Sequence, residues 1–167
     1  MSEPCVAKTA HESSSAPASC EAEQRERDAV IAEALTWLKT PYHHMGRIKG
    51  EHGGVDCAQI VALTYHSALP HRITAVPLEY YPPDWMFHRD LERYLTIVTQ
   101  HAREIETPKP GDVVLWKIGR VFAHGAIVLP PGWPHIIHSD MNAKRVETGD
   151  GRQGRLAGRD KKFFTLW

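Results

Sequence analysis

The first half of the sequence has the apolar spacing of amphipathic helices. From about residue 23, apolar residues recur every three or four positions and would form one stripe of a helix. The members of this stripe are Val30, Ala34, Trp37 and Leu38. The dipeptide Thr40-Pro41 is expected to end the helix, because the residue before a proline disfavours the α conformation.

A second apolar run, CAQIVALTYHSAL, begins at Cys57. Asp56 stands where an N-cap residue belongs, so we expect Cys57 in the first turn of a second helix, which Pro70 closes. A glycine-spaced loop precedes this helix, and a loop rich in proline and aromatic residues follows it. A shorter helix is predicted over about residues 89–100.

The C-terminal part of the chain changes to the pattern of β-strands. Turn residues separate five short apolar segments: PKPGDVVLW, VFAHGAIVL, HIIHSD, KRVET and KFFTLW. The last segment is expected to form an edge strand. Helices followed by strands predict an α+β fold, with N-terminal helices packed on an antiparallel sheet of about five strands. Residues 1–22 are rich in Ser, Ala, Glu and Pro and predict a disordered arm, which leaves residues 23–167 as a single domain.

Charge and hydropathy narrow the classes of partner. Lys and Arg total 20, as do Asp and Glu, so the net charge is zero with neutral histidines. Nucleic acid is not an expected partner, because phosphate binding needs clustered basic residues. No apolar run approaches the roughly 20 residues of a membrane span, and the first residues lack the basic and apolar regions of a secretory signal. We therefore expect a cytoplasmic protein, or one that uses a route other than general export. We also expect no cofactor.

The cysteines point to nucleophilic chemistry rather than to disulfides. Cys5 and Cys20 lie in the predicted arm, whereas Cys57 lies within the predicted domain. A thiol attacks as its thiolate, and the positive end of a helix dipole lowers the pKa of a cysteine placed there. The same first turn presents backbone N–H groups that can stabilise an oxyanion. Cys57 is therefore the candidate nucleophile.

A cysteine nucleophile needs a base, and His124 is the candidate. It lies on a predicted strand between Ala123 and Gly125, whose small size lets another group come close. His138 lies on the next predicted strand. Neighbouring antiparallel strands are about 4.8 Å apart, so the two imidazoles can touch and His138 can orient His124.

Other roles for these residues stay open. Cys57 is also compatible with a buried structural cysteine, and each histidine with a polar core residue. Cys57, His124 and His138 could bind zinc together with His52, but paired cysteines at the usual ligand spacing are missing, and we expect no metal. The aromatic loop at residues 80–87 either walls a substrate groove or packs on the sheet. The basic residues near the C-terminus, Arg155 among them, are expected to form a solvated face.

Five segments together resemble the NlpC family of cell-wall cysteine peptidases: TPYHHMG, VDCAQIV, PKPGDVVLW, AHGAIVL and HIIHSD. They occur in the family's order over about residues 24–140 and are most similar to the branch encoded by bacteriophages and prophages. The resemblance implies a papain-like fold and cleavage of amide bonds in peptidoglycan stem peptides. It implies Cys57 as the nucleophile, His124 as the base and His138 as the orienting residue.

The resemblance also places Tyr42 at the oxyanion pocket, and we expect Asp56 and Trp85 beside it at the substrate site. Stem peptides would be the substrate and phage tail proteins a second class of partner, for a virion-associated enzyme or one delivered to the cell wall. The family usually has Ser and Gly after its cysteine, whereas this chain has Ala58 and Gln59. Two alternatives therefore stay open: a tail-assembly component with little turnover, or an acyl hydrolase or transferase with another substrate.

Overall fold

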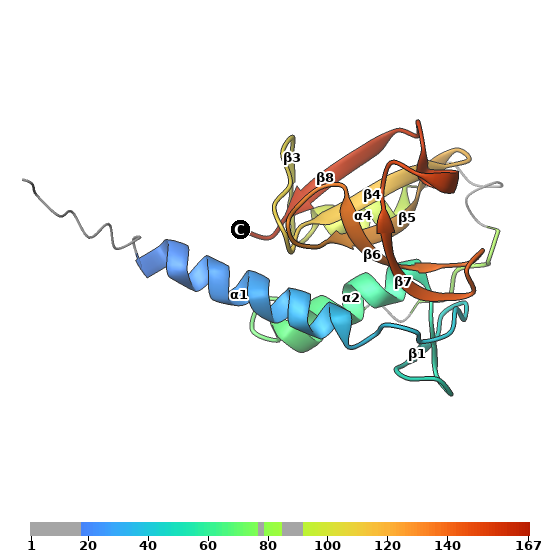
Figure 1. Cartoon of the computed structure of the whole chain (residues 1–167), viewed down its shortest axis with the longest axis horizontal. Coiled ribbons are helices and arrows are strands. Elements are labelled where there is room, and N and C mark those ends of the chain that lie inside the picture. Colours follow the sequence, from blue (N-terminus) through green and yellow to red (C-terminus); the bar gives the residue numbers. More distant parts are fainter. Residues whose placement is uncertain (1–17, 77–78, 85–91) are drawn as a thin grey trace, which may run out of the picture.

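Helices pack against one antiparallel sheet in the computed structural model, which describes residues 18–76, 79–84 and 92–167. The helices are α1 (Ala18–Leu35), α2 (Cys57–Ala68), α4 (Arg93–Thr99) and the 3₁₀ helix η1 (Gly154–Leu156). The strands are β1 (Arg47–Ile48), β2 (Gly54–Val55), β3 (Arg103–Ile105), β4 (Val113–Ile118), β5 (Val121–Val128), β6 (His135–Asp140), β7 (Arg145–Asp150) and β8 (Lys161–Thr165). Figure 1 shows α1 and α2 running side by side along one side of the sheet.

The main sheet has six strands in the order β3-β8-β4-β5-β6-β7, and every neighbouring pair is antiparallel. The predicted α+β class, with N-terminal helices on an antiparallel sheet, is confirmed. The chain end was wrongly predicted as an edge strand, because β8 lies between β3 and β4. β5 is likewise an interior strand of the sheet.

Several element boundaries differ from those predicted. Helix α1 begins at Ala18 rather than at about residue 23. Helix α4 begins at Arg93, and the predicted start of this helix at about residue 89 lies outside the described residues. The glycine-spaced loop contains the β1–β2 hairpin, which lacks the alternating apolar pattern of a longer strand. Its glycines allow close packing, since a Cβ on Gly54 would overlap with the His43 side chain.

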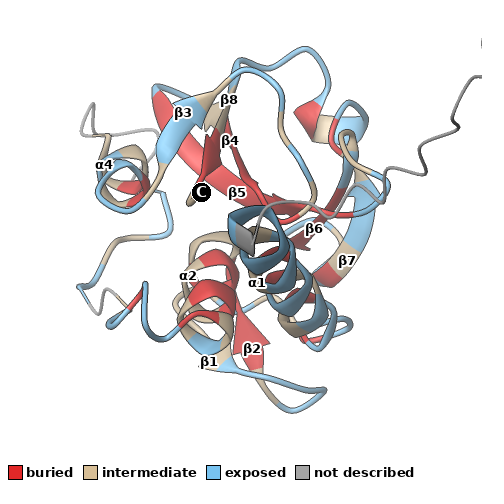
Figure 2. Ribbon diagram, turned by 90° about the vertical axis from the view of Figure 1, so that its left-hand side faces the viewer, coloured by how far each residue is buried: buried red, intermediate tan, exposed pale blue. Residues whose placement is uncertain are grey.

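Both faces of the sheet are buried. One face packs against the helices through Ile60 and Tyr65 of α2 and Val98 of α4. The other face forms a second apolar cluster with Leu156 of η1, built around Trp116. Figure 2 shows β4, β5 and the sheet-facing side of α2 coloured as buried. This double coverage explains why the predicted strands read as almost continuous apolar runs. In the described part of the chain, no helix is long and apolar enough to cross a bilayer.

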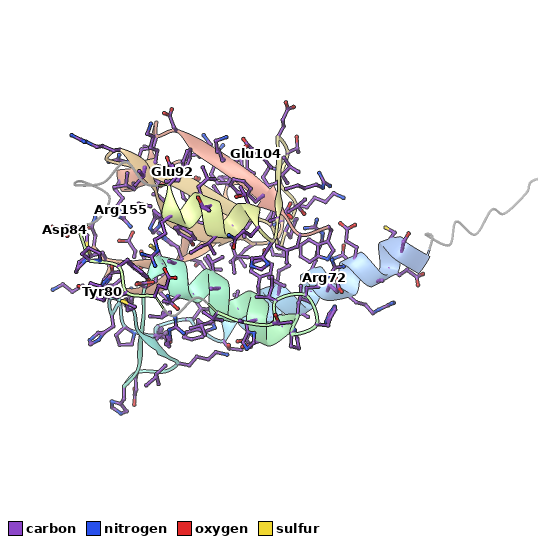
Figure 3. The ribbon with its side chains drawn as sticks, turned by 180° about the vertical axis from the view of Figure 1, so that it is seen from behind. Arg72, Tyr80, Asp84, Glu92, Glu104 and Arg155 are labelled. Carbon is purple, nitrogen blue, oxygen red and sulfur yellow. The ribbon has the colours of Figure 1, made fainter. Side chains whose placement is uncertain are left out.

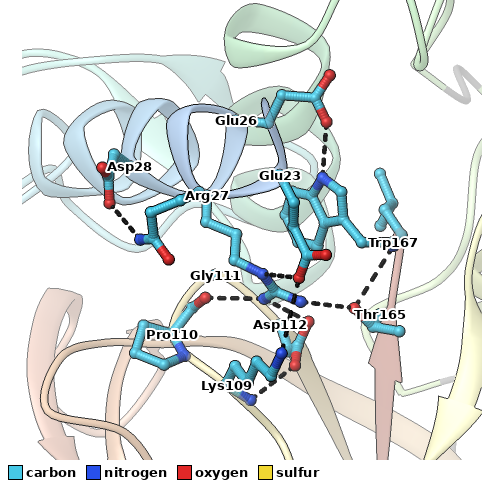
Figure 4. Close-up of polar contacts among 12 residues, drawn as sticks. Glu23, Glu26, Arg27, Asp28, Lys109, Pro110, Gly111, Asp112, Thr165 and Trp167 are labelled. Atoms are coloured by element: carbon cyan, nitrogen blue, oxygen red, sulfur yellow. Dashed lines mark hydrogen bonds and ion pairs between the residues drawn. The ribbon is translucent and has the colours of Figure 1, made fainter. Parts of the chain in front are cut away.

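A buried arginine ties α1 to the end of the sheet (Figure 4). The Arg27 guanidinium donates to Asp112 Oδ1 at 2.9 Å, to the Pro110 carbonyl at 2.9 Å and to Thr165 Oγ1 at 3.1 Å. It also lies over the Trp167 ring, 4.1 Å from the centroid. The Arg27 and Asp112 side chains are only 5% and 1% exposed, so removing one leaves the other as a buried, uncompensated charge.

We predict that Arg27→Ala lowers the free energy of unfolding by about 3–5 kcal/mol, because the Asp112 carboxylate loses its counter-charge. Urea denaturation followed by circular dichroism measures this change. Arg25→Ala on the same helix is the matched control, because Arg25 is 71% exposed and its ion pair with Glu21 is 4.0 Å long. That variant should stay within about 0.5 kcal/mol of the wild type. Equal effects of the two substitutions would contradict a structural role for the Arg27 pair.

Candidate active site

The Asp56 carboxylate builds the start of α2. Its Oδ1 atom accepts from the backbone N–H groups of Ala58 and Gln59 at 3.1 and 2.9 Å, as an N-cap does. Its Oδ2 atom accepts from the Met45 N–H and the Tyr81 hydroxyl, both at 2.7 Å. Asp56 is 2% exposed, and these four bonds supply the polar contacts that a buried carboxylate needs. The predicted N-cap is confirmed, and it fixes Cys57 at the first position of the helix.

The Cys57 sulfur lies against the backbone of β5. The thiol donates to the Ala123 carbonyl oxygen, 3.6 Å from Sγ, and the nearby Gly125 N–H favours the thiolate and so lowers the pKa of Cys57. Backbone groups of alternate residues on a strand point to opposite neighbours. The Leu129 N–H donates to the His135 carbonyl, so the backbone groups of Leu129 point toward β6. Ala123 and Gly125 stand an even number of residues before Leu129, so their backbone groups point toward the same side.

β6 pairs with β5 only at Ile127 and Val128. Beyond these residues β6 turns away, and Ser139 bonds the Val55 carbonyl instead. The thiol therefore occupies the place that β6 would take beside Ala123 and Gly125. The sheet therefore opens at this point of an interior strand.

Tyr94 of α4 holds the other side of Cys57. Its hydroxyl donates to the Cys57 carbonyl at 3.1 Å, and its ring lies directly over Gly125. A Cβ on Gly125 would overlap with the Tyr94 hydroxyl. The small residue beside His124 thus admits a side chain from a distant helix.

The side chains of His124 and His138 meet on the face of the sheet that carries Trp116, opposite to the face that Tyr94 covers. Nε2 of His124 and Nδ1 of His138 are 2.8 Å apart, and the residues are 2% and 5% exposed. The Arg155 guanidinium approaches the other nitrogen of His124, with Nη2 at 3.0 Å from Nδ1. Nε of Arg155 is 3.5 Å from Oδ2 of Asp140, and Nε2 of His138 is 4.0 Å from that same oxygen.

Electrostatics leave the resting thiol protonated. Burial raises the pKa of Cys57 to about 12, with the negative charge of Asp56 acting in the same direction. The Gly125 N–H and the Arg155 charge act against this rise. Burial lowers the pKa of His124 well below its ordinary value, and it lowers that of His138 too. The direction for Cys57 is opposite to the one predicted from the helix dipole, because burial and Asp56 outweigh the dipole.

Cys57 opens onto a cleft of about 140 Å³ between α2, α4 and the sheet. Tyr42, Asp56 and Ala123 line it together with Cys57, and its lining is mostly apolar. The apolar and aromatic side chains that line it include Val61, Tyr65, Ile73, Ile97, Val98 and Leu166. Trp85, predicted to line the substrate site, lies outside the described residues.

Tyr42 lies close to Cys57, Asp56 and Arg155, whose charges all influence its hydroxyl. Burial is the main cause that raises the pKa of Tyr42, so the phenol stays protonated and can donate a hydrogen bond. The role of Tyr42 in the oxyanion pocket, which the family resemblance implied, stays a prediction.

The metal alternative involves different residues from those considered in the sequence. His52 is exposed on the hairpin beside Glu51, away from the two buried histidines. His138, Asp140 and Glu147 instead place three ligand atoms within 4.8 Å of one another. Arg155 and Arg145 lie 3.5 and 3.6 Å from these two carboxylates. Their positive charges oppose a cation there, and we assign no metal role to the cluster.

Sequence reasoning missed Tyr94 and Arg155 as residues that shape the site, and it included Tyr81 only as a member of the aromatic loop that could wall a groove. The two tyrosines come from a loop and from α4, and their contacts with Asp56 and Cys57 depend on long-range folding. Arg155 stands among several basic residues and carries no motif. Its predicted place on a solvated face is wrong, because its side chain is 24% exposed and contacts His124.

Three solved structures share this arrangement of helices and sheet. The NlpC/p60 domain of the peptidoglycan hydrolase SagA matches with a TM-score of 0.54 and 20% identity, over 81% of this chain and 96% of that one. The chain has an NlpC/P60-like fold. The P60 domain of antigen MAP1204 from M. avium subspecies paratuberculosis matches with a TM-score of 0.54 and 13% identity, over 86% and 96% of the two chains.

The peptidoglycan hydrolase RipB from Mycobacterium tuberculosis matches with a TM-score of 0.57 and 16% identity, over 90% of this chain and 68% of that one. No family model matches the sequence, and no curated protein matches it significantly. The NlpC/P60-like fold is thus shared with peptidoglycan hydrolases at low sequence identity. The predicted likeness to the phage-encoded branch stays a prediction from the sequence.

We predict that Gly125→Ala lowers the free energy of unfolding by about 1–3 kcal/mol, because the added methyl displaces the Tyr94 hydroxyl. Urea denaturation measures the change. Gly149→Ala on β7 is the matched control, since a Cβ there meets only His138 Nε2 at 3.8 Å, an ordinary contact. If Gly125→Ala proves as stable as the control, Tyr94 does not pack on Gly125 as described.

We also predict the pH dependence of the reaction between Cys57 and iodoacetamide. A free thiol has a pKa of about 8.5, and the rate at Cys57 should keep increasing at pH values where such a thiol is already ionised. Asp56→Asn should move the midpoint down, because it removes the negative charge beside the sulfur. The experiment uses a Cys5→Ser/Cys20→Ser background, with Asp160→Asn as the exposed control. A midpoint below that of a free thiol would contradict the protonated resting state.

Proposed function

We propose that the chain is a cysteine amidohydrolase that cleaves amide bonds in peptidoglycan stem peptides through a thioester intermediate. One observation carries this proposal: the Cys57 sulfur lies at the start of α2 against the backbone of Ala123 and Gly125, the two neighbours of His124. A nucleophile at a helix start next to a histidine-bearing strand is the arrangement that thiol acyl transfer requires.

The first turn of α2 offers a place for the oxyanion. Asp56 takes the N–H groups of Ala58 and Gln59, and the Cys57 N–H, which precedes them in the same turn, is not among the groups that it binds. This N–H and the Tyr42 hydroxyl are the donors that we assign to the oxyanion of the tetrahedral intermediate. Each donor of this kind contributes roughly 10²–10³-fold to the rate of acyl transfer in well-studied hydrolases.

His124 supplies the proton transfers. It accepts the thiol proton as Cys57 attacks the amide carbonyl, and the imidazolium then protonates the leaving amine. Water hydrolyses the thioester, with His124 again acting as the base. His138 binds Nε2 of His124 and keeps the ring oriented through both half-reactions.

The choice of substrate rests on the shared fold and on the sequence motifs. The similar structures include hydrolases of peptidoglycan, and five segments of this chain resemble the NlpC cell-wall peptidases. The phage-encoded branch, tail proteins as partners and the location in the cell stay predictions from the sequence.

The mostly apolar lining of the cleft favours a second candidate, an acyl hydrolase or transferase for a substrate other than peptidoglycan. Val61, Ile97 and Val98 offer few groups to bind a charged muropeptide, but they suit an acyl chain. Faster turnover of long-chain than of short-chain p-nitrophenyl esters, without cleavage of stem peptides, would support this candidate over the first.

We predict that Cys57→Ala and His124→Ala each lower kcat/KM for a synthetic stem peptide by about 10⁴-fold or more, because each removes a member of one catalytic unit. Product release is followed by chromatography, and circular dichroism checks that the variants fold. Cys20→Ala is the control, since Cys20 is exposed on α1 and should leave the rate unchanged. Full activity in Cys57→Ala would falsify the proposed function.

A further inference from the structure

Arg155 reaches the site from the C-terminal part of the chain. Figure 3 shows it at the end of the molecule where α2 begins, on the same side as Tyr80 and Asp84. The buried Leu156 anchors η1 in the apolar cluster around Trp116, and the Arg155 carbonyl accepts from Arg159 at 2.6 Å. The Arg155 backbone is therefore held in place, while its side chain keeps partial access to solvent.

The contact with Arg155 fixes the protons on both histidines. A guanidinium only donates, so Nδ1 of His124 must be the unprotonated acceptor at 3.0 Å. The proton of His124 then lies on Nε2 and is donated to Nδ1 of His138. His138 consequently carries its own proton on Nε2, which faces the Asp140 carboxylate 4.0 Å away. The order of donation is Arg155 to His124 to His138.

This order occupies the lone pair that His124 needs as a base. Both ring nitrogens bond to other side chains, so His124 can take the thiol proton only after the Arg155 guanidinium moves off Nδ1. The guanidinium keeps donors that its known contacts do not use. Nε is buried without a hydrogen bond among the described residues, 3.5 Å from Asp140, so the donor that a ligand can reach is Nη1, which no described contact involves.

We propose that Arg155 binds a carboxylate of the substrate and, by leaving His124 to do so, releases the base for catalysis. The inference rests on the proposed cysteine chemistry and narrows its substrate class to acyl donors with a free carboxylate near the scissile bond. A carboxylate matches the planar guanidinium in a bidentate pair, which is stronger than its bond to a neutral imidazole. Arg155 thus couples recognition of the correct substrate to activation of Cys57.

Two alkylating reagents of almost equal size test this inference without any peptide cleavage. Iodoacetate carries a carboxylate and iodoacetamide is neutral, so the ratio of their rates at Cys57 reports on a carboxylate site. In the Cys5→Ser/Cys20→Ser background, we expect Arg155→Gln to lower the iodoacetate-to-iodoacetamide ratio by about tenfold, through loss of a close charge pair. Intact-protein mass spectrometry measures both rates.

Arg152→Gln is the matched control, because Arg152 lies three positions away with a 63% exposed side chain paired to Asp150. It removes the same charge and should leave the ratio unchanged. Equal falls in the two variants would show a general field effect and overturn a carboxylate site at Arg155.

The same data test the release of the base. If Arg155 blocks His124, Arg155→Gln should react several-fold faster with iodoacetamide at neutral pH, since the imidazole can then accept the thiol proton. A slower reaction would mean that Arg155 only stabilises a resting thiolate, and it would overturn the gating role. Circular dichroism checks that the variant folds, and Arg155→Lys should keep part of the ratio because it keeps the charge.

Cleavage of synthetic stem peptides tests whether the carboxylate site at Arg155 also acts during turnover. A pair that differs only by a free carboxylate or a carboxamide next to the scissile bond should differ in kcat/KM in the wild type, and Arg155→Gln should erase the difference. Equal turnover of the pair by the wild type would overturn the carboxylate requirement. If neither peptide is cleaved, the proposed function fails, while the alkylation ratios still decide whether Arg155 binds a carboxylate.

Discussion

One carboxylate, that of Asp56, organises the whole site. It caps α2, bonds the loop before the helix through Met45 and bonds the loop after the helix through Tyr81. Because it is buried, each of these bonds is needed to offset the loss of hydration of a charged group. The position of Cys57 follows directly from this cap. The same charge has a cost for the chemistry, since it disfavours a thiolate next to it.

Strand β5 connects the nucleophile to the base, because its backbone contacts the sulfur and one of its side chains is the base. The Cys57 sulfur meets backbone atoms of Ala123 and Gly125 in the plane of the sheet, and His124 points its side chain to the face that carries Trp116 and His138. The arrangement depends on β6 leaving β5 early, which opens the backbone to the sulfur. In the resting state Arg155 completes the hydrogen bonding of His124, so the thiol and the imidazole are both neutral. A neutral thiol beside a neutral imidazole differs from a thiolate–imidazolium pair formed before the substrate binds. Catalysis from this state therefore needs a step that activates the base.

Local signals made much of the fold predictable. The N-cap at Asp56, the helix that follows it and the strands around His124 and His138 were visible because periodicity and capping are properties of short segments. The contact between the two histidines was expected from neighbouring strands, but it forms where β5 and β6 no longer pair. The interior place of β8, the hairpin β1–β2 and the roles of Tyr94 and Arg155 were not predictable, because they depend on contacts between residues far apart in the chain. The direction of the Cys57 pKa was missed for the same reason, since burial is decided by the complete fold.

The central claim is that Cys57 carries the acyl group during turnover. The most direct measurement mixes the protein with a stem peptide, quenches the reaction in acid within the first turnover and determines the mass of the intact chain and of its proteolytic fragments. The account predicts an acyl adduct on the fragment that contains Cys57, sensitive to hydroxylamine as a thioester is, and lost in Cys57→Ala. Peptide cleavage that proceeds without any adduct on that fragment, or an adduct on another residue, would contradict it.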